Sequence, residues 1–139
     1  MKPILPLTAL AVALLSHPVC AQTAAPTAAD AEAFVDKAEE AMFAHSLTQG
    51  RADWINATYI TDDTDALATE IGAKRTEMNV GFALEAAKYA TVQGLSPELT
   101  RRLLLLRTQL TLPAPTTPGA AQELNRLSTG LQSAYGKGK

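Results

Sequence analysis

The leucine-rich segment that ends at Pro113 constrains the fold of this chain more than any other part of its sequence. Its leucines form one stripe at helical spacing (Leu99, Leu103, Leu106, Leu110) and also occupy other sides of the same helix (Leu104, Leu105, Leu112). A helix that is apolar on more than one face needs partners on both sides. We therefore expect helices that cover a larger body, which this chain does not contain.

The composition favours helices along the whole chain. Hydrophobic residues make up 47% of it and aromatic residues only 5%, because alanine and leucine supply the apolar content. Such a composition favours an all-α fold over a β-sandwich or barrel. The 139 residues fit one domain, and 12 basic against 14 acidic residues argue against a strongly basic nucleic-acid-binding protein.

Residues 1–21 have the pattern of a secretory signal peptide. A basic start at Lys2 is followed by an apolar run over residues 4–15 and by small residues just before Ala21. The run is shorter than the roughly 20 apolar residues that a membrane span needs, and no later run reaches that length. We expect cleavage after Ala21 and a periplasmic or secreted protein. Lipid attachment at Cys20 is the alternative, which Val19 disfavours because lipoprotein signals place Gly, Ala or Ser before the cysteine.

Four helices are expected after a disordered or extended tether at residues 22–29, and together they make up a unit over residues 30–139. Their starts carry capping signals, namely Thr27 with Asp30, Thr61 with the aspartates after it, Ser96-Pro97 and Thr117-Pro118. The second helix should be the long one, about 30 residues from Thr61 to about Val92. Gly50 either interrupts the first helix or lies within it, and the sequence leaves both open.

Each predicted helix has an apolar stripe that should face the core. In the first helix the stripe is Ala31, Phe34, Val35, Ala38, Met42 and His45, in the second it is Leu67, Ile71, Met78, Phe82 and Tyr89, and in the fourth it is Leu124, Leu127, Leu131 and Ala134. We also expect Trp54 to be a buried anchor between the first two helices, because a large aromatic side chain buries about 150 Å² or more.

The residues that suggest chemistry have simpler structural explanations. His45 is the one histidine left after signal cleavage, and a ligand role would need partners such as Met42 or Met78, so we expect it to pack with a polar edge. The cluster Asp62, Asp63 and Asp65 lacks the glycine and distant glutamate of a calcium loop, so we expect it to cap a helix.

Two further patterns lead to no site. Arg101, Arg102 and Arg107 diverge around their helix, so we expect solvated or snorkelling charges. The sequon at residues 56–58 matters only in a eukaryotic secretory host. The sequence has no Gly-x-Ser-x-Gly, P-loop or dinucleotide fingerprint, and we assign no catalytic, cofactor-binding or metal-binding residue.

The segment Trp54 to Thr61 carries a family signal. Its sequence, Trp-Ile-Asn-Ala-Thr-Tyr-Ile-Thr, resembles the Trp-x-x-x-Thr-x-Ile-Thr segment near the mature N-terminus of the angiotensin-converting enzyme family, particularly its bacterial members. An acidic, alanine-rich helix precedes the segment and a long helix follows it, as in that family. The Glu-Leu-Asn-Arg-Leu of residues 123–127, leading to Tyr-Gly-Lys-Gly-Lys at residues 135–139, continues the same order.

The resemblance implies part of a helical zinc peptidyl-dipeptidase, an enzyme that removes dipeptides from the C-termini of peptides. Members bind zinc through a His-Glu-x-x-His helix and a downstream glutamate, and they bind chloride. No His-Glu pair occurs in this sequence. The resemblance therefore covers only the N-terminal helices, which form a lid over the family's substrate channel.

We expect the N-terminal segment of an exported metallopeptidase, inactive alone and meeting peptide substrate only through an absent catalytic body. Zinc and chloride belong to that body, and exposed leucines could make the segment self-associate. The alternative is a stand-alone exported helical protein that binds a partner as an adapter.

Overall fold

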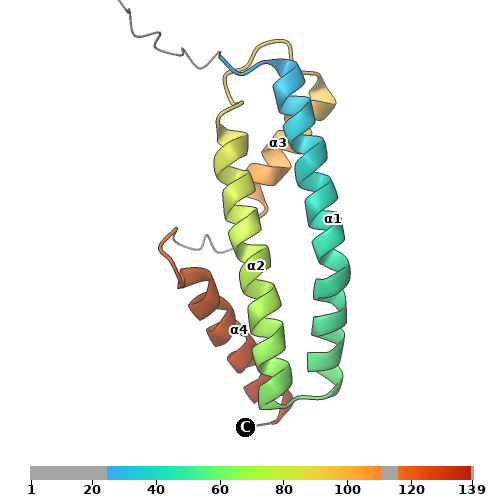
Figure 1. The fold of residues 1–139 in the computed structure, drawn as a ribbon, viewed down its shortest axis with the longest axis vertical. Helices are drawn as coiled ribbons and strands as arrows, with labels where there is room; N and C mark the ends of the chain where they lie inside the picture. The colour runs from blue at the N-terminus through green and yellow to red at the C-terminus, as the bar shows by residue number, and fades with distance from the viewer. Residues whose placement is uncertain (1–24, 111–115, 139) are drawn as a thin grey trace, which may run out of the picture.

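The structure, a computed structural model, describes residues 25–110 and 116–138, and every regular element in these ranges is an α-helix (Figure 1). The helices are α1 (Ala28–Thr58), α2 (Asp62–Ala87), α3 (Pro97–Thr108) and α4 (Ala120–Gly136). The all-α prediction is therefore confirmed. The expected signal peptide and the first part of the expected tether lie outside the described residues.

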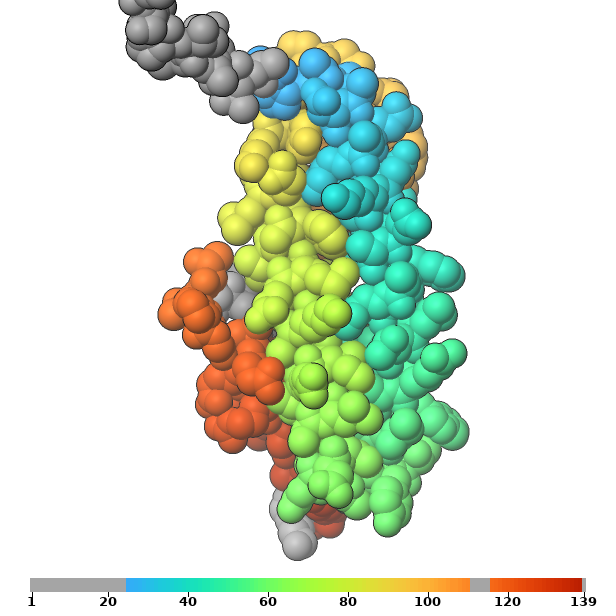
Figure 2. Space-filling model, viewed as in Figure 1, coloured from blue at the N-terminus to red at the C-terminus, as the bar shows by residue number. Residues whose placement is uncertain are grey.

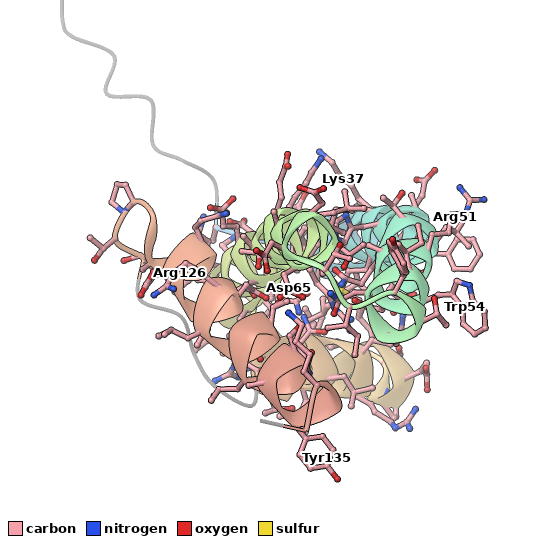
Figure 3. The ribbon with its side chains drawn as sticks, turned by 90° about the horizontal axis from the view of Figure 1, so that it is seen from below. Lys37, Arg51, Trp54, Asp65, Arg126 and Tyr135 are labelled. Carbon is pink, nitrogen blue, oxygen red and sulfur yellow. The ribbon has the colours of Figure 1, made fainter. Side chains whose placement is uncertain are left out.

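Helices α1 and α2 form an antiparallel hairpin, and the two shorter helices pack against it. Helix α3 contacts both members of the hairpin, and α4 contacts α2. Seen along the hairpin, α3 and α4 lie on the same side of it (Figure 3). The space-filling view shows that side chains of α1 and α2 meet along the hairpin, while α4 covers the flank of α2 (Figure 2).

Three of the four predicted helix starts are confirmed. Thr27 forms a capping box with Asp30, Thr61 caps α2, and the Ser96 hydroxyl accepts from the backbone of Leu99 at the start of α3. The prediction for the fourth helix was wrong. Helix α4 begins after Gly119, which makes no side-chain cap. The φ of Gly119 is 82°, a left-handed backbone conformation that favours glycine.

Helix lengths differ from the predicted ones in two places. One helix of about 30 residues is present, but it is α1, with 31 residues running through Gly50 without interruption. Helix α2 has 26 residues and ends at Ala87 instead of about Val92. Turns over residues 88–91 and the positive φ of Gly94 redirect the chain there, so that α3 can return along the hairpin.

The hydrophobic core lies where α3 meets the hairpin. Its buried residues are Ala31, Val35, Ala38, Ala86, Tyr89, Leu99, Leu103 and Leu106. The Phe34 ring stacks on the Tyr89 ring at a centroid distance of 5.4 Å, which fixes the start of α1 against the end of α2. In the first leucine stripe, Leu99, Leu103 and Leu106 are therefore buried and Leu110 is half-buried. Leu104 and Leu105, on the other sides of α3, are exposed.

Helix α4 packs with a different face from the one its leucines predict. The side chains that meet α2 are small or polar (Ala121, Asn125, Thr129 and Ser133), while Leu127 and Leu131 are exposed. The predicted stripe of α4 was therefore wrong as a core face. The physical reason is the close approach of α4 to α2 at Gly72, which leaves no room for large side chains.

Trp54 is not the anchor that its size predicts. Its side chain is 69% exposed and projects away from the helices (Figure 3). Ala52 and Asn56, on the opposite side of α1, occupy the buried positions instead. Within the described ranges, no helix combines the length and the apolar character needed to cross a membrane.

Candidate functional site

A polar cleft of about 590 Å³ lies between α1, α2 and α4. Its lining is rich in amide and hydroxyl side chains, among them Gln49, Asn56, Asn125, Ser128, Thr129, Gln132 and Ser133. Helix α4 supplies most of these groups because its polar face is turned toward the hairpin. The cleft therefore forms where the structure departs from the predicted packing of α4.

Gln49 is the most deeply placed amide of this cleft. It is 8% exposed, and its Nε2 donates to Oδ1 of Asp53 at 2.7 Å. Its Oε1 is buried and has no hydrogen-bond partner among the described residues. A buried carbonyl oxygen without a donor costs about 1–3 kcal/mol, so this atom is the clearest unmet hydrogen-bonding demand of the cleft.

Asn125, which lines the same cleft as Gln49, holds α4 against α2. Its Nδ2 donates to Oγ1 of Thr76 and to the carbonyl of Ala121, both at 2.9 Å. Its Oδ1 faces Gly72, where an added Cβ would lie 2.5 Å from that oxygen. Gly72 is thus the position that permits the two helices to approach each other.

Asp65 joins three helices at the end of the cleft near the α1–α2 turn. Its Oδ1 accepts a hydrogen bond from Nδ2 of Asn56 in α1 at 2.7 Å and another from the hydroxyl of Ser133 in α4. Burial raises the pKa of Asp65, but these bonds and the charge of Lys137 lower it further, so the net pKa lies below its ordinary value. Asp65 is therefore ionised at neutral pH and acts as a structural acceptor.

His45 lies outside this cleft and packs as predicted. Its Nε2 lies 3.2 Å from the carbonyl oxygen of Ile71, so the ring joins α1 to α2 when Nε2 carries the proton. Met42 and Met78 line the adjacent groove with it. The prediction of a packed histidine with a polar edge is confirmed.

The acidic cluster behaves as predicted, with one addition. Asp62, Asp63 and Asp65 all lie in the first turn of α2, where carboxylates complement the helix dipole. The interhelical role of Asp65 was not predicted. It depends on Ser133, which is far away in the sequence.

For the arginines of α3, the prediction was wrong at one position. Arg101 and Arg107 are exposed, but Arg102 forms ion pairs with Asp36 and Glu39 of α1. Its side chain is 23% exposed. The three arginines do diverge as expected, and that divergence is what directs Arg102 alone toward the acidic side of α1.

Sequence reasoning missed most residues of the cleft, although a signal was present. Ala121, Asn125, Thr129 and Ser133 recur every four residues, which places them on one face of α4. Small and polar residues in such a row permit close helix contact, but the leucines of the same helix form the stronger hydrophobic pattern. The leucine pattern therefore predicts the wrong buried face for α4.

The family profile of angiotensin-converting enzyme, Peptidase M2, matches residues 25–139. The chain belongs to the angiotensin-converting enzyme family. The match spans every described helix, so the resemblance that starts from Trp54 to Thr61 is confirmed for the family as a whole. No curated protein and no solved structure gives a significant match to the chain.

The described residues of this member of the angiotensin-converting enzyme family do not fit the zinc site of a metallopeptidase. Over the described ranges, no three His, Cys, Asp or Glu side chains gather where they could hold a metal ion. His45 contacts a backbone carbonyl through Nε2, and its neighbours Met42 and Met78 are poor zinc ligands. We therefore derive no catalytic step from this chain.

Proposed function

We propose that the chain is the N-terminal segment of an exported zinc peptidyl-dipeptidase. In this proposal the four helices cover the substrate channel of a catalytic body that other residues build. The body supplies the zinc, the chloride and the groups that remove a dipeptide from the C-terminus of a peptide. This chain restricts access to the channel and has no activity alone.

The observation that carries the proposal is the set of exposed apolar side chains on α3 and α4. Leu104 and Leu105 of α3 and Leu127, Leu131 and Tyr135 of α4 are all exposed. Large exposed apolar patches on a folded unit mark contact surfaces. The match to the metallopeptidase family supports a catalytic body of that family as the partner of this surface.

The first test is an activity measurement on the purified full chain with zinc and chloride added. The substrate is a reporter peptide from which release of the C-terminal dipeptide can be followed. We expect no release above a sample treated with a chelator, because the sequence contains no His-Glu-x-x-His motif. Zinc-dependent release by this chain would contradict the proposal.

A second test reads the DNA that follows the codon of Lys139. We expect a His-Glu-x-x-His motif to be encoded downstream, in the same frame or another one. If no reading frame downstream encodes this motif, the result would favour a protein that works without a catalytic body.

We further propose export, with cleavage after Ala21, on the signal-like pattern of residues 1–21. The check is the intact mass of the protein recovered from the periplasm of a bacterial host. A chain starting at Gln22 agrees with cleavage by signal peptidase. A diacylglycerol-bearing Cys20 at the N-terminus would indicate a lipoprotein, and a full-length cytoplasmic product would contradict export.

The second candidate function is a stand-alone helical binding module. It is supported by the core around Val35 and Leu103 and by the cleft that contains Oε1 of Gln49, which has no partner among the described residues. A chain with its own core should unfold in one sharp thermal transition, as followed by circular dichroism. A helical chain that melts without cooperativity would exclude the module and agree with a lid separated from its body.

A further inference from the structure

Helix α1 carries a second apolar stripe on the side that faces away from the core. Phe43, Leu47 and Trp54 are 69%, 54% and 69% exposed. Together with Gly50, which is also exposed, they form what we call the outer stripe. Ala38 and Ala52 mark the opposite, buried side of the same helix. The outer stripe therefore lies largely outside the packing of this bundle.

The spacing of the outer stripe is that of a coiled-coil seam. Its four residues follow one another at intervals of four, three and four, which is the alternation of a and d positions in a heptad. A side chain at Gly50 would meet no atom within 4 Å, so the middle of the seam is open space. In a coiled coil, a seam of this kind is filled by a second helix.

The outer stripe is complementary to itself when it is reversed. About a point midway between residues 48 and 49, Phe43 falls opposite Trp54 of a second copy, and Leu47 falls opposite Gly50. The leucine then fills the space above the glycine, and the two aromatic rings meet at both ends. We propose that a second copy of this chain docks here, with the two α1 helices antiparallel.

Charge selects this orientation over a parallel one. Glu40 and, one turn earlier, Asp36 continue the outer stripe toward the N-terminus of α1. Asp36 is paired with Arg102 of α3, so the orientation depends on Glu40. A parallel pair would place the two Glu40 carboxylates against each other, and like charges in contact are unfavourable. In the antiparallel pair the two Glu40 residues lie about 25 Å apart along the helices. The same acidic residues disfavour an anionic lipid surface as the occupant.

The size of the outer stripe predicts a weak dimer. Two large aromatic side chains and one leucine can bury on the order of 400 Å² per copy. The total of about 800 Å² is below the roughly 1,200 Å² of standard stable interfaces. We therefore expect a dissociation constant in the micromolar range.

The outer stripe belongs to α1, whereas the exposed side chains assigned to the catalytic body belong to α3 and α4. Trp54 projects from the outer side of α1, whereas Tyr135 projects from α4 on another side of the molecule (Figure 3). The inference therefore does not depend on the proposed function. The inference also distinguishes a specific dimer formed through α1 from nonspecific association through the leucines of α4.

The experiment measures self-association of the full chain by sedimentation velocity and by tryptophan fluorescence. Trp54 is the single tryptophan of the chain, so its emission reports directly on this surface. We expect a monomer–dimer equilibrium over about 1–200 µM, with a blue shift of the emission as the dimer forms. Leu47→Glu should weaken the dimer at least tenfold and abolish the blue shift.

The matched control is Leu131→Glu, which places the same charge on the exposed face of α4, where Leu131 is 73% exposed. It should leave the equilibrium unchanged, and circular dichroism should show native helicity for both variants. A monomer at every concentration would overturn the proposal. Association that is lost in Leu131→Glu and kept in Leu47→Glu would overturn it too.

Orientation is tested by disulfide trapping in a Cys20→Ser background. Glu40 and Ala57 are opposite each other across the antiparallel pair. A mixture of Glu40→Cys and Ala57→Cys chains should therefore form the mixed disulfide dimer on mild oxidation. Efficient trapping of Glu40→Cys with itself would overturn the antiparallel arrangement.

Discussion

Arg102 of α3 binds the carboxylate of Glu39 of α1 at two points. Its Nε donates to Oε1 at 2.9 Å, and its Nη2 donates to Oε2 at 2.7 Å. The same Nη2 lies 2.7 Å from Oδ1 of Asp36. The two-point geometry makes this pair stronger than ordinary surface pairs, and it connects segments that are 63 residues apart.

Arg102→Ala should lower the thermal midpoint of unfolding by a few degrees. The variant removes both contacts to Glu39, and it also removes the aliphatic stem that covers the junction of α1 with α3. Arg101→Ala is the matched control, because Arg101 is exposed on the same helix. Equal midpoints for the two variants, measured by circular dichroism at moderate salt, would show that the pair does not stabilise the fold.

Asp65→Asn should reduce the loss of stability in acid. The pKa of Asp65 is lower in the folded chain than its ordinary value of 3.8, so the unfolded chain binds the proton first as the pH falls. The contribution of this carboxylate is complete above about pH 5 and is lost as the pH falls through the folded pKa.

The measurement for Asp65 is the free energy of unfolding in urea at several pH values from about 6 to 3. The wild-type curve should fall toward acid more steeply than the curve of Asp65→Asn. Asp63→Asn changes an exposed carboxylate in the same helical turn and should alter the slope less than Asp65→Asn does. Parallel curves for wild type and Asp65→Asn would contradict the role of the Asn56 and Ser133 hydrogen bonds.

Gly72→Ala should destabilise the chain by about 1–3 kcal/mol, although alanine is the better helix former. The new methyl group would meet Oδ1 of Asn125 at 2.5 Å, and Asn125 is held by Thr76 and Ala121. Gly81→Ala in the same helix meets no atom within 4 Å and should stabilise by about 0.5–1 kcal/mol. Chemical unfolding measures both, and the same sign for both would refute the close approach of α4.

Gln49→Leu should leave the stability unchanged or raise it by about 1 kcal/mol. The change removes the buried Oε1 that has no donor among the described residues, and it keeps most of the side-chain volume. Asp53 loses a hydrogen bond, but it is exposed and can bind water. A clear loss of stability in urea unfolding would mean that the amide of Gln49 has a partner inside the cleft.

The helix starts could be predicted from short stretches of sequence because capping is a local interaction. Thr27 and Ser96 each bond to a backbone amide three residues away, so the pattern and the bond lie within one turn. The start of α4 could not be predicted in this way. Gly119 begins that helix through its backbone conformation and not through a side chain.

The polar row of α4 is visible in the sequence, but the contacts of the candidate site are not, because they join distant segments. Asp65 and Ser133 are 68 residues apart, and nothing near either residue identifies the other. The packing of His45 was predicted correctly because a single histidine beside an apolar stripe lacks the further ligands that a metal site needs. Arg102 was not, since its partners lie on another helix.

The sequence by itself determined that the chain is helical, where three of its helices begin, and which family it resembles. These properties depend on composition, on local hydrogen bonds and on short motifs. Only the tertiary structure decided which face of α4 is buried and that Trp54 of α1 is exposed. Burial depends on the shape of the neighbouring helix as well as on hydrophobicity, and at Gly72 the backbones come close enough for a small, polar face of α4 to replace its leucines.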